Sequence, residues 1–97
     1  MQINLTVVFK SKPEHIEDVR AMLLNLVEKS REEKACLQYD LHHGTRNPEI
    51  FIFHEIWESQ EGLDLHDQQP YIKKLVAEIP ALIQEPAAIY HTELLNL

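Results

Sequence analysis

Residues 50–57 read IFIFHEIW, and the pattern within this stretch decides the fold. Side chains alternate between the two faces of a strand, so one face carries Ile50, Ile52, His54 and Ile56, and the other carries Phe51, Phe53, Glu55 and Trp57. Both sets are largely apolar. A strand of this kind is buried on both sides and needs cover on each. The rest of the chain must supply that cover.

Two other stretches have the alternation of strands. They are residues 2–10, QINLTVVFK, and residues 36–43, CLQYDLHH. Their expected inward-facing residues are Ile3, Leu5, Val7 and Phe9 in the first, and Leu37, Tyr39 and Leu41 in the second. Residues 44–49, GTRNPE, combine Gly, Asn and Pro and predict the loop of a hairpin that joins 36–43 to 50–57.

A helix is predicted between the first two strands and reaches about Lys34. Ser11 and Glu14 have the spacing of a capping box, and Pro13 fits the first helical turn. The apolar stripe that follows has spacings of three and four and consists of Ile16, Val19, Leu23, Leu26 and Val27. This pattern predicts one amphipathic helix.

The second half of the chain predicts more helix and a last strand. Ser59 is a good N-cap for a short helix over about 60–67. Pro70 opens another helix, which Pro80 should end or kink. A strand is expected over about 87–95.

The predicted order is β-α-β-β-α-β, which is the ferredoxin-like arrangement of the α+β class with an antiparallel sheet. A chain of 97 residues fits a single domain, residues 1–97. In so short a chain the helices cover only one face of the sheet. We therefore expect the other face to pack on the sheet of a second copy, as a homodimer.

Composition excludes several classes of function. Nine Lys and Arg against sixteen Asp and Glu give a net charge of −7, which disfavours binding to nucleic acid or to an anionic membrane surface. The sequence has no apolar run near eighteen residues and no signal-peptide pattern. The single cysteine, Cys36, forms no internal disulfide and is expected to be a small buried hydrophobe. A cytoplasmic location is expected.

Six histidines suggest a metal site, but their spacing does not support one. The HExxH motif and the i, i+4 pair on a helix are absent. His42 and His43 are adjacent on a strand and point to opposite faces. His54 with His91 is a conceivable pair across strands. We expect no metal.

His66 is the histidine with the most suggestive surroundings. It lies on the short helix after residues 50–57, with Asp64 and Asp67 close in sequence. If it faces the sheet it approaches Trp57 and Glu55, which share a strand face. Such a group would form a pocket for proton transfer beside a flat indole surface. The alternative is a solvated His66 and a Trp57 that only fills the core.

Glu55 is anomalous because it lies between apolar residues in the middle of a strand. A buried carboxylate without a partner is costly. It therefore pairs with a histidine or a tyrosine, or the sheet opens to a cavity at this point. Tyr39 and Tyr71 either line the same space or belong to the core.

Several short motifs together resemble a known family. They are Cys36-Leu37-x-Tyr39, Asn47-Pro48, Glu55-x-Trp57-Glu58-Ser59, His66 and Pro70-Tyr71. With the predicted strand order, they resemble the antibiotic biosynthesis monooxygenase superfamily, and most closely its small quinol-monooxygenase-like members. The resemblance implies a dimeric α+β barrel over nearly the whole chain.

The resemblance also implies a cavity between the sheet and the helices of each subunit. Family oxygenases use no metal, flavin or haem: an electron-rich polyphenol loses a proton and its anion reduces oxygen directly. By position, His66 would accept the proton, Glu55 would orient polar groups, and Trp57 would line the pocket as part of the catalytic set. The expected substrate-binding residues are Tyr39, Tyr71, Phe51 and Phe53.

The chain departs from the pattern of its relatives at three positions. Glu14 and Ala35 stand where relatives often have glycine, and Tyr71 stands where many have a second histidine. Haem-degrading relatives need a histidine on the later helix and an asparagine in the first strand. Residues 71–84 contain no histidine, and Asn4 lies too early in its strand. Haem degradation is therefore not expected.

The favoured function is a cofactor-independent monooxygenase, which takes a quinol or another hydroxylated aromatic and oxygen as substrates. A second possibility is an isomerase of a small hydroxyketone or sugar phosphate on the same fold. A third is a dimeric binding protein for an aromatic ligand, without catalysis.

Overall fold

Residues 50–57 form an inner strand of the sheet. The computed structural model describes residues 1–96. Its sheet has the order β2-β3-β1-β4, and every neighbouring pair is antiparallel. The strands are β1 (Ile3–Lys10), β2 (Cys36–His43), β3 (Ile50–Trp57) and β4 (Ala88–Thr92).

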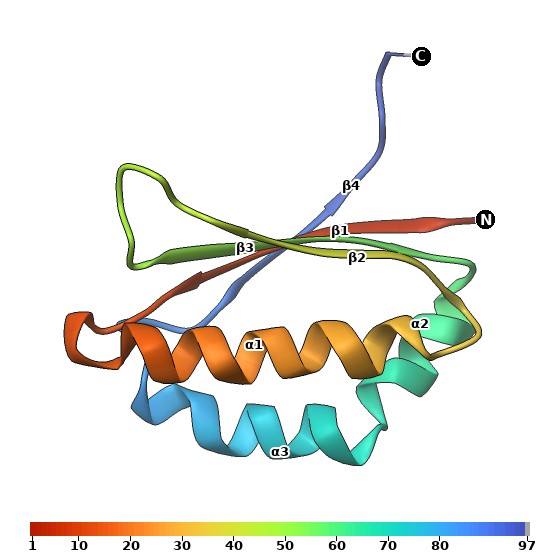
Figure 1. Cartoon of the computed structure of the whole chain (residues 1–97). Helices are drawn as coiled ribbons and strands as arrows, with labels where there is room; N and C mark the ends of the chain where they lie inside the picture. The colour runs from red at the N-terminus through yellow and green to blue at the C-terminus, as the bar shows by residue number, and fades with distance from the viewer. Residues whose placement is uncertain (97) are drawn as a thin grey trace.

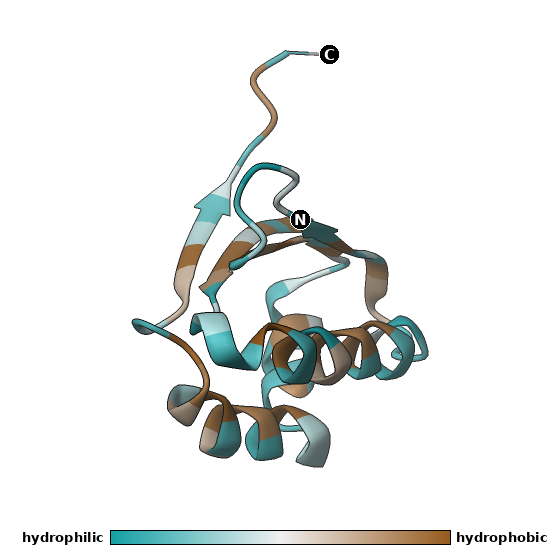
Figure 2. Ribbon diagram, turned by 60° about the vertical axis from the view of Figure 1, so that its left-hand side comes forward, coloured by the Kyte–Doolittle hydropathy of each residue, from teal (hydrophilic) through white to brown (hydrophobic). Residues whose placement is uncertain are grey.

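All the helices lie on one side of this sheet, as Figures 1 and 2 show from two directions. The α-helices are α1 (Ile16–Arg31), α2 (Gln60–Asp67) and α3 (Pro70–Glu78), and short 3₁₀ turns occupy η1 (Pro13–His15) and η2 (Ile79–Ala81). The chain therefore has the predicted ferredoxin-like α+β fold.

The two faces of β3 differ in burial. On the helix side, Phe51, Phe53 and Trp57 are almost completely buried. On the other side the isoleucines are half-buried and His54 is exposed. The helices of this chain thus cover one apolar face of the strand, and no element of residues 1–96 covers the other.

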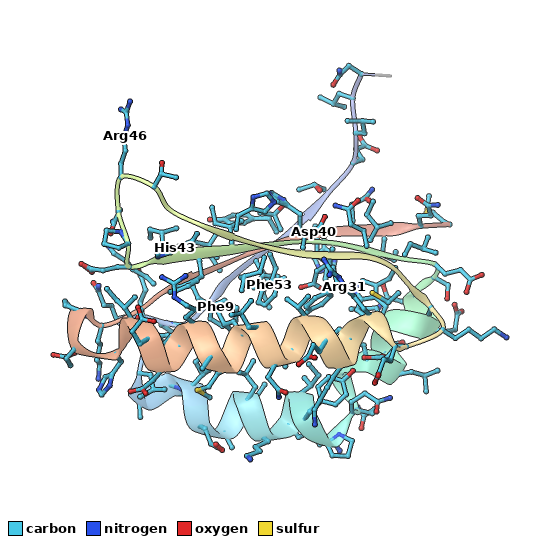
Figure 3. The ribbon with its side chains drawn as sticks, in the orientation of Figure 1. Phe9, Arg31, Asp40, His43, Arg46 and Phe53 are labelled. Atoms are coloured by element: carbon cyan, nitrogen blue, oxygen red, sulfur yellow. The ribbon has the colours of Figure 1, made fainter. Side chains whose placement is uncertain are left out.

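The core lies between the sheet and α1. Val19 and Leu23 of α1 are fully buried, and burial of each contributes about 1.5–3 kcal/mol. Phe9 and Phe53 project from neighbouring strands toward α1 (Figure 3). Their rings meet edge to face with centroids 6.0 Å apart. This packing holds the helix against the middle of the sheet.

The capping box predicted at Ser11 and Glu14 is wrong. The Ser11 side chain is fully buried, and its hydroxyl donates to the carbonyl of Lys12 at 2.9 Å. The Ser11 N–H donates to the carbonyl of Glu49 at 2.8 Å, and Ser11 also forms a β-bridge with Ile83. Ser11 therefore contacts distant segments of the chain instead of capping the helix. The predicted proline does lie in the first turn, η1.

The predicted end of the first helix is also wrong, because α1 ends at Arg31 rather than near Lys34. The Arg31 guanidinium donates to the Tyr39 carbonyl at 3.0 Å and to the Asp40 carboxylate at 2.8 Å. These bonds join the last turn of α1 to β2 (Figure 3). The chain must reverse before β2, and residues 32–35 form that turn.

Two strand predictions need correction. Leu37 was expected to face the core but is 52% exposed, because the pairing register of β2 shifts between Cys36 and Gln38. Such a bulge places an extra residue in one strand and turns its side chain away. The last strand, expected to reach residue 95, ends at Thr92. Thr92 pairs with Asn4, the second residue of β1. Residues after Thr92 would have almost no part of β1 left to pair with, so the strand ends there.

Ser59 caps α2 as predicted: its hydroxyl accepts from the N–H of Gly62 at 3.1 Å. Gly62 does not interrupt the helix, which continues through it. A Cβ at Gly62 would lie 2.4 Å from the Cβ of Ala35. The glycine therefore allows α2 to approach the turn between α1 and β2, and this approach positions the site described below.

We expect Gly62→Ala to destabilise the protein by about 1–3 kcal/mol through overpacking, although the same change in an open helix stabilises by about 0.5–1 kcal/mol. Adding Ala35→Gly removes the opposing methyl group and should restore most of the loss. Urea denaturation followed by circular dichroism measures both. A single variant as stable as the parent would contradict the close contact.

Candidate active site

His66 lies in the last turn of α2 and faces the sheet. It is 4% exposed. Its ring packs on the indole of Trp57, with centroids 4.3 Å apart and planes inclined by 39°. The interpretation of His66 as a solvated surface residue is therefore wrong.

The partner of His66 is Glu33, in the turn between α1 and β2. The Nδ1 atom of His66 lies 2.7 Å from Oε2 of Glu33, and both side chains are largely buried. The hydroxyl of Tyr71 donates to the same carboxylate oxygen. An ionised carboxylate only accepts, so Nδ1 carries the hydrogen and Nε2 has the free lone pair. In the neutral ring, Glu33 thus fixes the tautomer of His66.

Glu55 is paired, but with neither a histidine nor a tyrosine. Its carboxylate accepts a hydrogen bond from the indole N–H of Trp57 at 2.9 Å. Burial raises the pKa of the Glu55 carboxyl, while this hydrogen bond and nearby His66 oppose the rise. The prediction of a histidine or tyrosine partner is wrong because residues two apart on a strand share a face, and Trp57 is nearer.

Because the pKa of Glu55 is raised in the native state, the free energy of unfolding should depend on pH. The carboxyl holds its proton more tightly in the native state than in the unfolded state. The protonated carboxyl therefore stabilises the native state fully below its ordinary pKa near 4.5, and this stabilisation is lost as pH rises through the native pKa. We expect Glu55→Gln to gain stability relative to the parent as pH rises from about 4. Urea titrations across this range measure the difference, with exposed Glu58→Gln as the control. A pH-independent difference would contradict it.

Tyr39 completes an aromatic cluster around His66. Its ring centroid lies 5.7 Å from that of His66 and 6.1 Å from that of Trp57. Burial raises the pKa of the Tyr39 phenol and of the Tyr71 phenol, so both remain protonated donors at neutral pH. The buried hydroxyl of Ser30 lies near both phenols.

The two phenylalanines expected at the site are not both part of it. Phe53 contacts the cluster through Tyr39, with ring centroids 4.9 Å apart. Phe51 stacks instead on His43, with centroids 4.6 Å apart and planes inclined by 18°, and the Arg20 guanidinium lies over its ring. Phe51 therefore belongs to the other end of the sheet.

The expected cavity between sheet and helices exists, but the expected residues do not line it. It has a volume of about 490 Å³ and an apolar lining from β1, α3 and the chain leading into β4. None of the seven predicted site residues contributes to it. A separate crevice of about 310 Å³ is lined by Lys29, Glu32, Glu33, Gln69 and Tyr71. This crevice brings solvent to the carboxylate that holds His66.

Residues 1–96 contain neither a cluster of metal ligands nor a helix that could cross a membrane. No three His, Cys, Asp or Glu residues there come together in a way that suits a metal ion. His54 pairs with Thr6 and His91 pairs with Leu5, so these two histidines point to opposite faces of the sheet. No helix in the same range has the length and apolar character needed to cross a membrane.

Cys36, at the start of β2, is partly buried and forms no disulfide. Burial and nearby Glu33 and Glu55 raise the pKa of its thiol to about 11. The thiolate is the nucleophilic form, so this cysteine is unreactive at neutral pH. Its position fits the prediction of a small apolar side chain.

Glu33 was not among the residues predicted for the site. It lies in the charged run Arg31-Glu32-Glu33-Lys34, and the sequence does not indicate which of the two adjacent glutamates is buried. Only the turn after α1 sends the Glu33 side chain inward while Glu32 stays exposed. A buried histidine on α2 was a signal that some carboxylate must face it, but the pattern does not indicate which one.

Several known proteins resemble this chain over most of its length. The family model described as antibiotic biosynthesis monooxygenase matches residues 3–78. An uncharacterised Synechocystis protein, sll1783, is 34% identical over 80 residues, which are 82% of this chain and 54% of that protein. The chain therefore spans about half the length of that relative. YcnE of Bacillus subtilis, named provisionally as a monooxygenase, is 29% identical over 92 residues, 95% of this chain and 97% of YcnE.

A solved structure has the same fold as this chain. PA3566 from Pseudomonas aeruginosa superposes with a TM-score of 0.92 at 28% identity, covering 98% of this chain and 95% of PA3566. Fold and site define a small α+β protein with a ferredoxin-like sheet and a buried histidine–carboxylate pair. Since the family model covers well over half of the chain, the protein belongs to the antibiotic biosynthesis monooxygenase family. The predicted resemblance is confirmed.

Proposed function

We propose that this protein is a monooxygenase that oxidises a quinol or another hydroxylated aromatic with oxygen, without a metal or organic cofactor. The observation that carries the proposal is the contact of 2.7 Å between Nδ1 of His66 and the Glu33 carboxylate, in a cluster of aromatic rings. Membership of the family supports the reaction class.

The His66–Glu33 pair has the properties of a general base. Neutral His66 accepts a proton at Nε2, and the imidazolium that forms is stabilised by the adjacent carboxylate. Tyr71 donates to the same carboxylate and keeps it oriented. The fully buried indole of Trp57 packs against the His66 ring and fixes its orientation.

The proposed reaction begins when a substrate proton moves to His66. The resulting phenolate anion, whose charge is shared with a ring carbon, gives one electron to oxygen. The radical and superoxide then combine to form a carbon–oxygen bond. His66 returns its proton to the terminal peroxide oxygen. Loss of the remaining proton from the carbon and of hydroxide from the peroxide leaves a carbonyl and one water. One oxygen atom enters the product and the other becomes water.

Oxygen uptake tests this proposal. The assay uses reduced menadione and a panel of polyphenols with a chelator present, and the same compounds without protein give the spontaneous rate. Uptake above that rate, unchanged by the chelator, is the expected result. Absence of uptake across the panel would reject the oxygenase and leave the isomerase or the binding protein.

We also propose that the working unit is a homodimer formed through the uncovered face of the sheet. Ile52 and Ile56 of β3 are half-buried there, with Val8 of β1 beside Ile52. Apolar residues on an open sheet face are a liability unless they are covered. A second copy presents the same surface and provides that cover.

Light scattering at micromolar concentration should give about twice the chain mass of 11.4 kDa. Ile52→Asp, in the middle of the open face, should convert the dimer to a monomer because burying an unpaired charge is costly. Leu24→Asp, on the exposed side of α1, is the matched control and should leave the dimer intact. A parent protein that is already monomeric would reject this proposal.

A further inference from the structure

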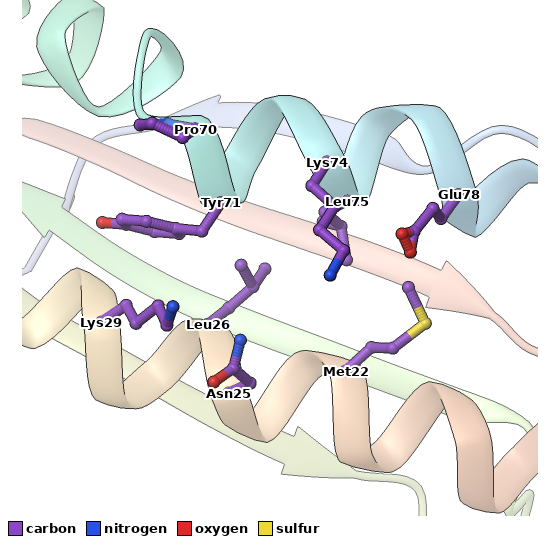
Figure 4. A pocket seen from close by; sticks show the side chains of 9 residues that line it. All are labelled: Met22, Asn25, Leu26, Lys29, Pro70, Tyr71, Lys74, Leu75 and Glu78. Atoms are coloured by element: carbon purple, nitrogen blue, oxygen red, sulfur yellow. The ribbon is translucent and has the colours of Figure 1, made fainter.

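We propose that a groove between α1 and α3 is a binding site for a small aromatic carboxylate, distinct from the site of the proposed oxidation. The groove has a volume of about 340 Å³. Leu26 and Leu75, both buried core residues, form its floor, and the ring of Tyr71 forms one wall (Figure 4). A space of this size holds a molecule of one or two rings.

Three hydrogen-bond donors converge on the groove from its two sides. Lys29 and Asn25 project from α1, and Lys74 projects from α3 toward them (Figure 4). Within residues 1–96, neither ammonium group has a carboxylate at ion-pair distance, and the Asn25 amide makes no hydrogen bond. Lys29 is also held over the ring of Tyr71, with Nζ 5.7 Å from the ring centroid.

The charge of this groove differs from that of the chain as a whole. The protein carries a net charge of −7 and has only nine basic residues, yet two of them, the exposed Lys29 and Lys74, line this one groove from its two sides. Two ammonium groups that converge without a counter-ion favour an anion between them. The one carboxylate that lines the groove, Glu78, follows Lys74 by one turn of α3 and lies beside Met22, at the end away from Tyr71 (Figure 4).

These features together select the class of ligand. Two ammonium groups and an amide donor match the acceptor oxygens of a carboxylate. The leucine floor and the tyrosine ring match a flat apolar body, which an inorganic anion lacks. Glu78 would repel a second negative group, so a monoanion fits better than a dicarboxylate.

Tyr71 connects this groove to the histidine pair. Its ring lines the groove, while its hydroxyl donates to Glu33, the partner of His66. An occupant that contacts the ring therefore also restrains the hydroxyl that orients the Glu33 carboxylate. Binding in this groove does not itself require the proposed oxidation.

The experiment is a titration of the ¹⁵N-labelled protein with 1-naphthoate, followed by amide shifts. Saturable shifts are expected along the facing sides of α1 and α3. Lys29→Gln and Lys74→Gln should each weaken binding about tenfold, the usual effect of losing one charge-assisted hydrogen bond. Lys73→Gln is the matched control, because this exposed lysine is adjacent on α3 but does not line the groove.

Two further ligands test whether binding needs the carboxylate group and whether it needs the aromatic body. The neutral 1-naphthylmethanol should bind at least about tenfold more weakly than 1-naphthoate, and inorganic phosphate should not displace naphthoate at equal concentration. Equal affinity for the alcohol, displacement by phosphate, or equal weakening by Lys73→Gln would each overturn the proposal. So would shifts confined to other parts of the chain. Because the readout is binding, these results do not depend on whether the protein consumes oxygen.

Discussion

His66→Ala is expected to lower turnover in the oxygen-uptake assay by roughly 10²–10⁴, the usual contribution of a positioned general base. The Nε2 atom of His66 is the base in the proposed reaction, and the aromatic side chains around it offer no substitute. Tyr39 and Tyr71 have phenol pKa values raised by burial and stay protonated. The loss should appear in kcat, because the step affected is proton transfer.

Two further variants separate catalysis from folding. His66→Gln keeps an N–H that can donate to Glu33 and protects the fold if the alanine variant unfolds. Glu33→Gln keeps His66 but removes the carboxylate that fixes its tautomer, so we expect a smaller loss and an altered pH dependence of kcat. His15→Gln, in the turn η1 and outside the candidate site, is the control. Unchanged turnover in folded His66→Gln would remove His66 from the mechanism.

Trp57→Ala is expected to destabilise the protein by about 3–5 kcal/mol, as for other large aromatic residues removed from a core. Trp57 is fully buried and contacts Tyr39, His66 and Glu55. The substitution creates a cavity and also leaves the Glu55 carboxyl without its donor. Urea denaturation followed by circular dichroism measures this, because Trp57 is the only tryptophan and fluorescence is lost with it.

A double-mutant cycle isolates the hydrogen bond from the packing. Trp57→Phe keeps most of the ring but removes the N–H, which should cost about 1–3 kcal/mol with Glu55 present. With Glu55→Leu as the background, no buried acceptor is left unpaired, and the same change should cost less. Exposed Leu24→Ala should change stability by no more than about 0.5 kcal/mol. Equal costs of Trp57→Phe in both backgrounds would show that the bond to Glu55 contributes nothing.

Most of the secondary structure could be predicted because it depends on local patterns. Alternating residues in 2–10, 36–43 and 50–57 indicate the three strands, and apolar spacings of three and four indicate α1. The errors lie at the ends of elements. Ser11 and Thr92 are determined by contacts with distant segments, which a local pattern does not contain.

Part of the candidate site could be predicted in the same way. Glu55 and Trp57 had to share a face, since residues two apart on a strand always do. The helix with His66 follows directly after this strand, so the approach of His66 to Trp57 was a reasonable expectation. The aromatic and acidic partners on one strand face were thus available from the sequence.

The sequence determined which face of the sheet each residue occupies, and the tertiary structure decided which of these residues meet. Phe51 and Trp57 share a face, but each residue of a strand advances about 3.3 Å, so six positions separate them by roughly 20 Å. Glu33 lies in a turn, where no period fixes the direction of a side chain. The approach of α2 to that turn, through the contact of Gly62 with Ala35, brings Glu33 to His66. A partner across more than thirty residues of chain is set by packing, which no local pattern contains.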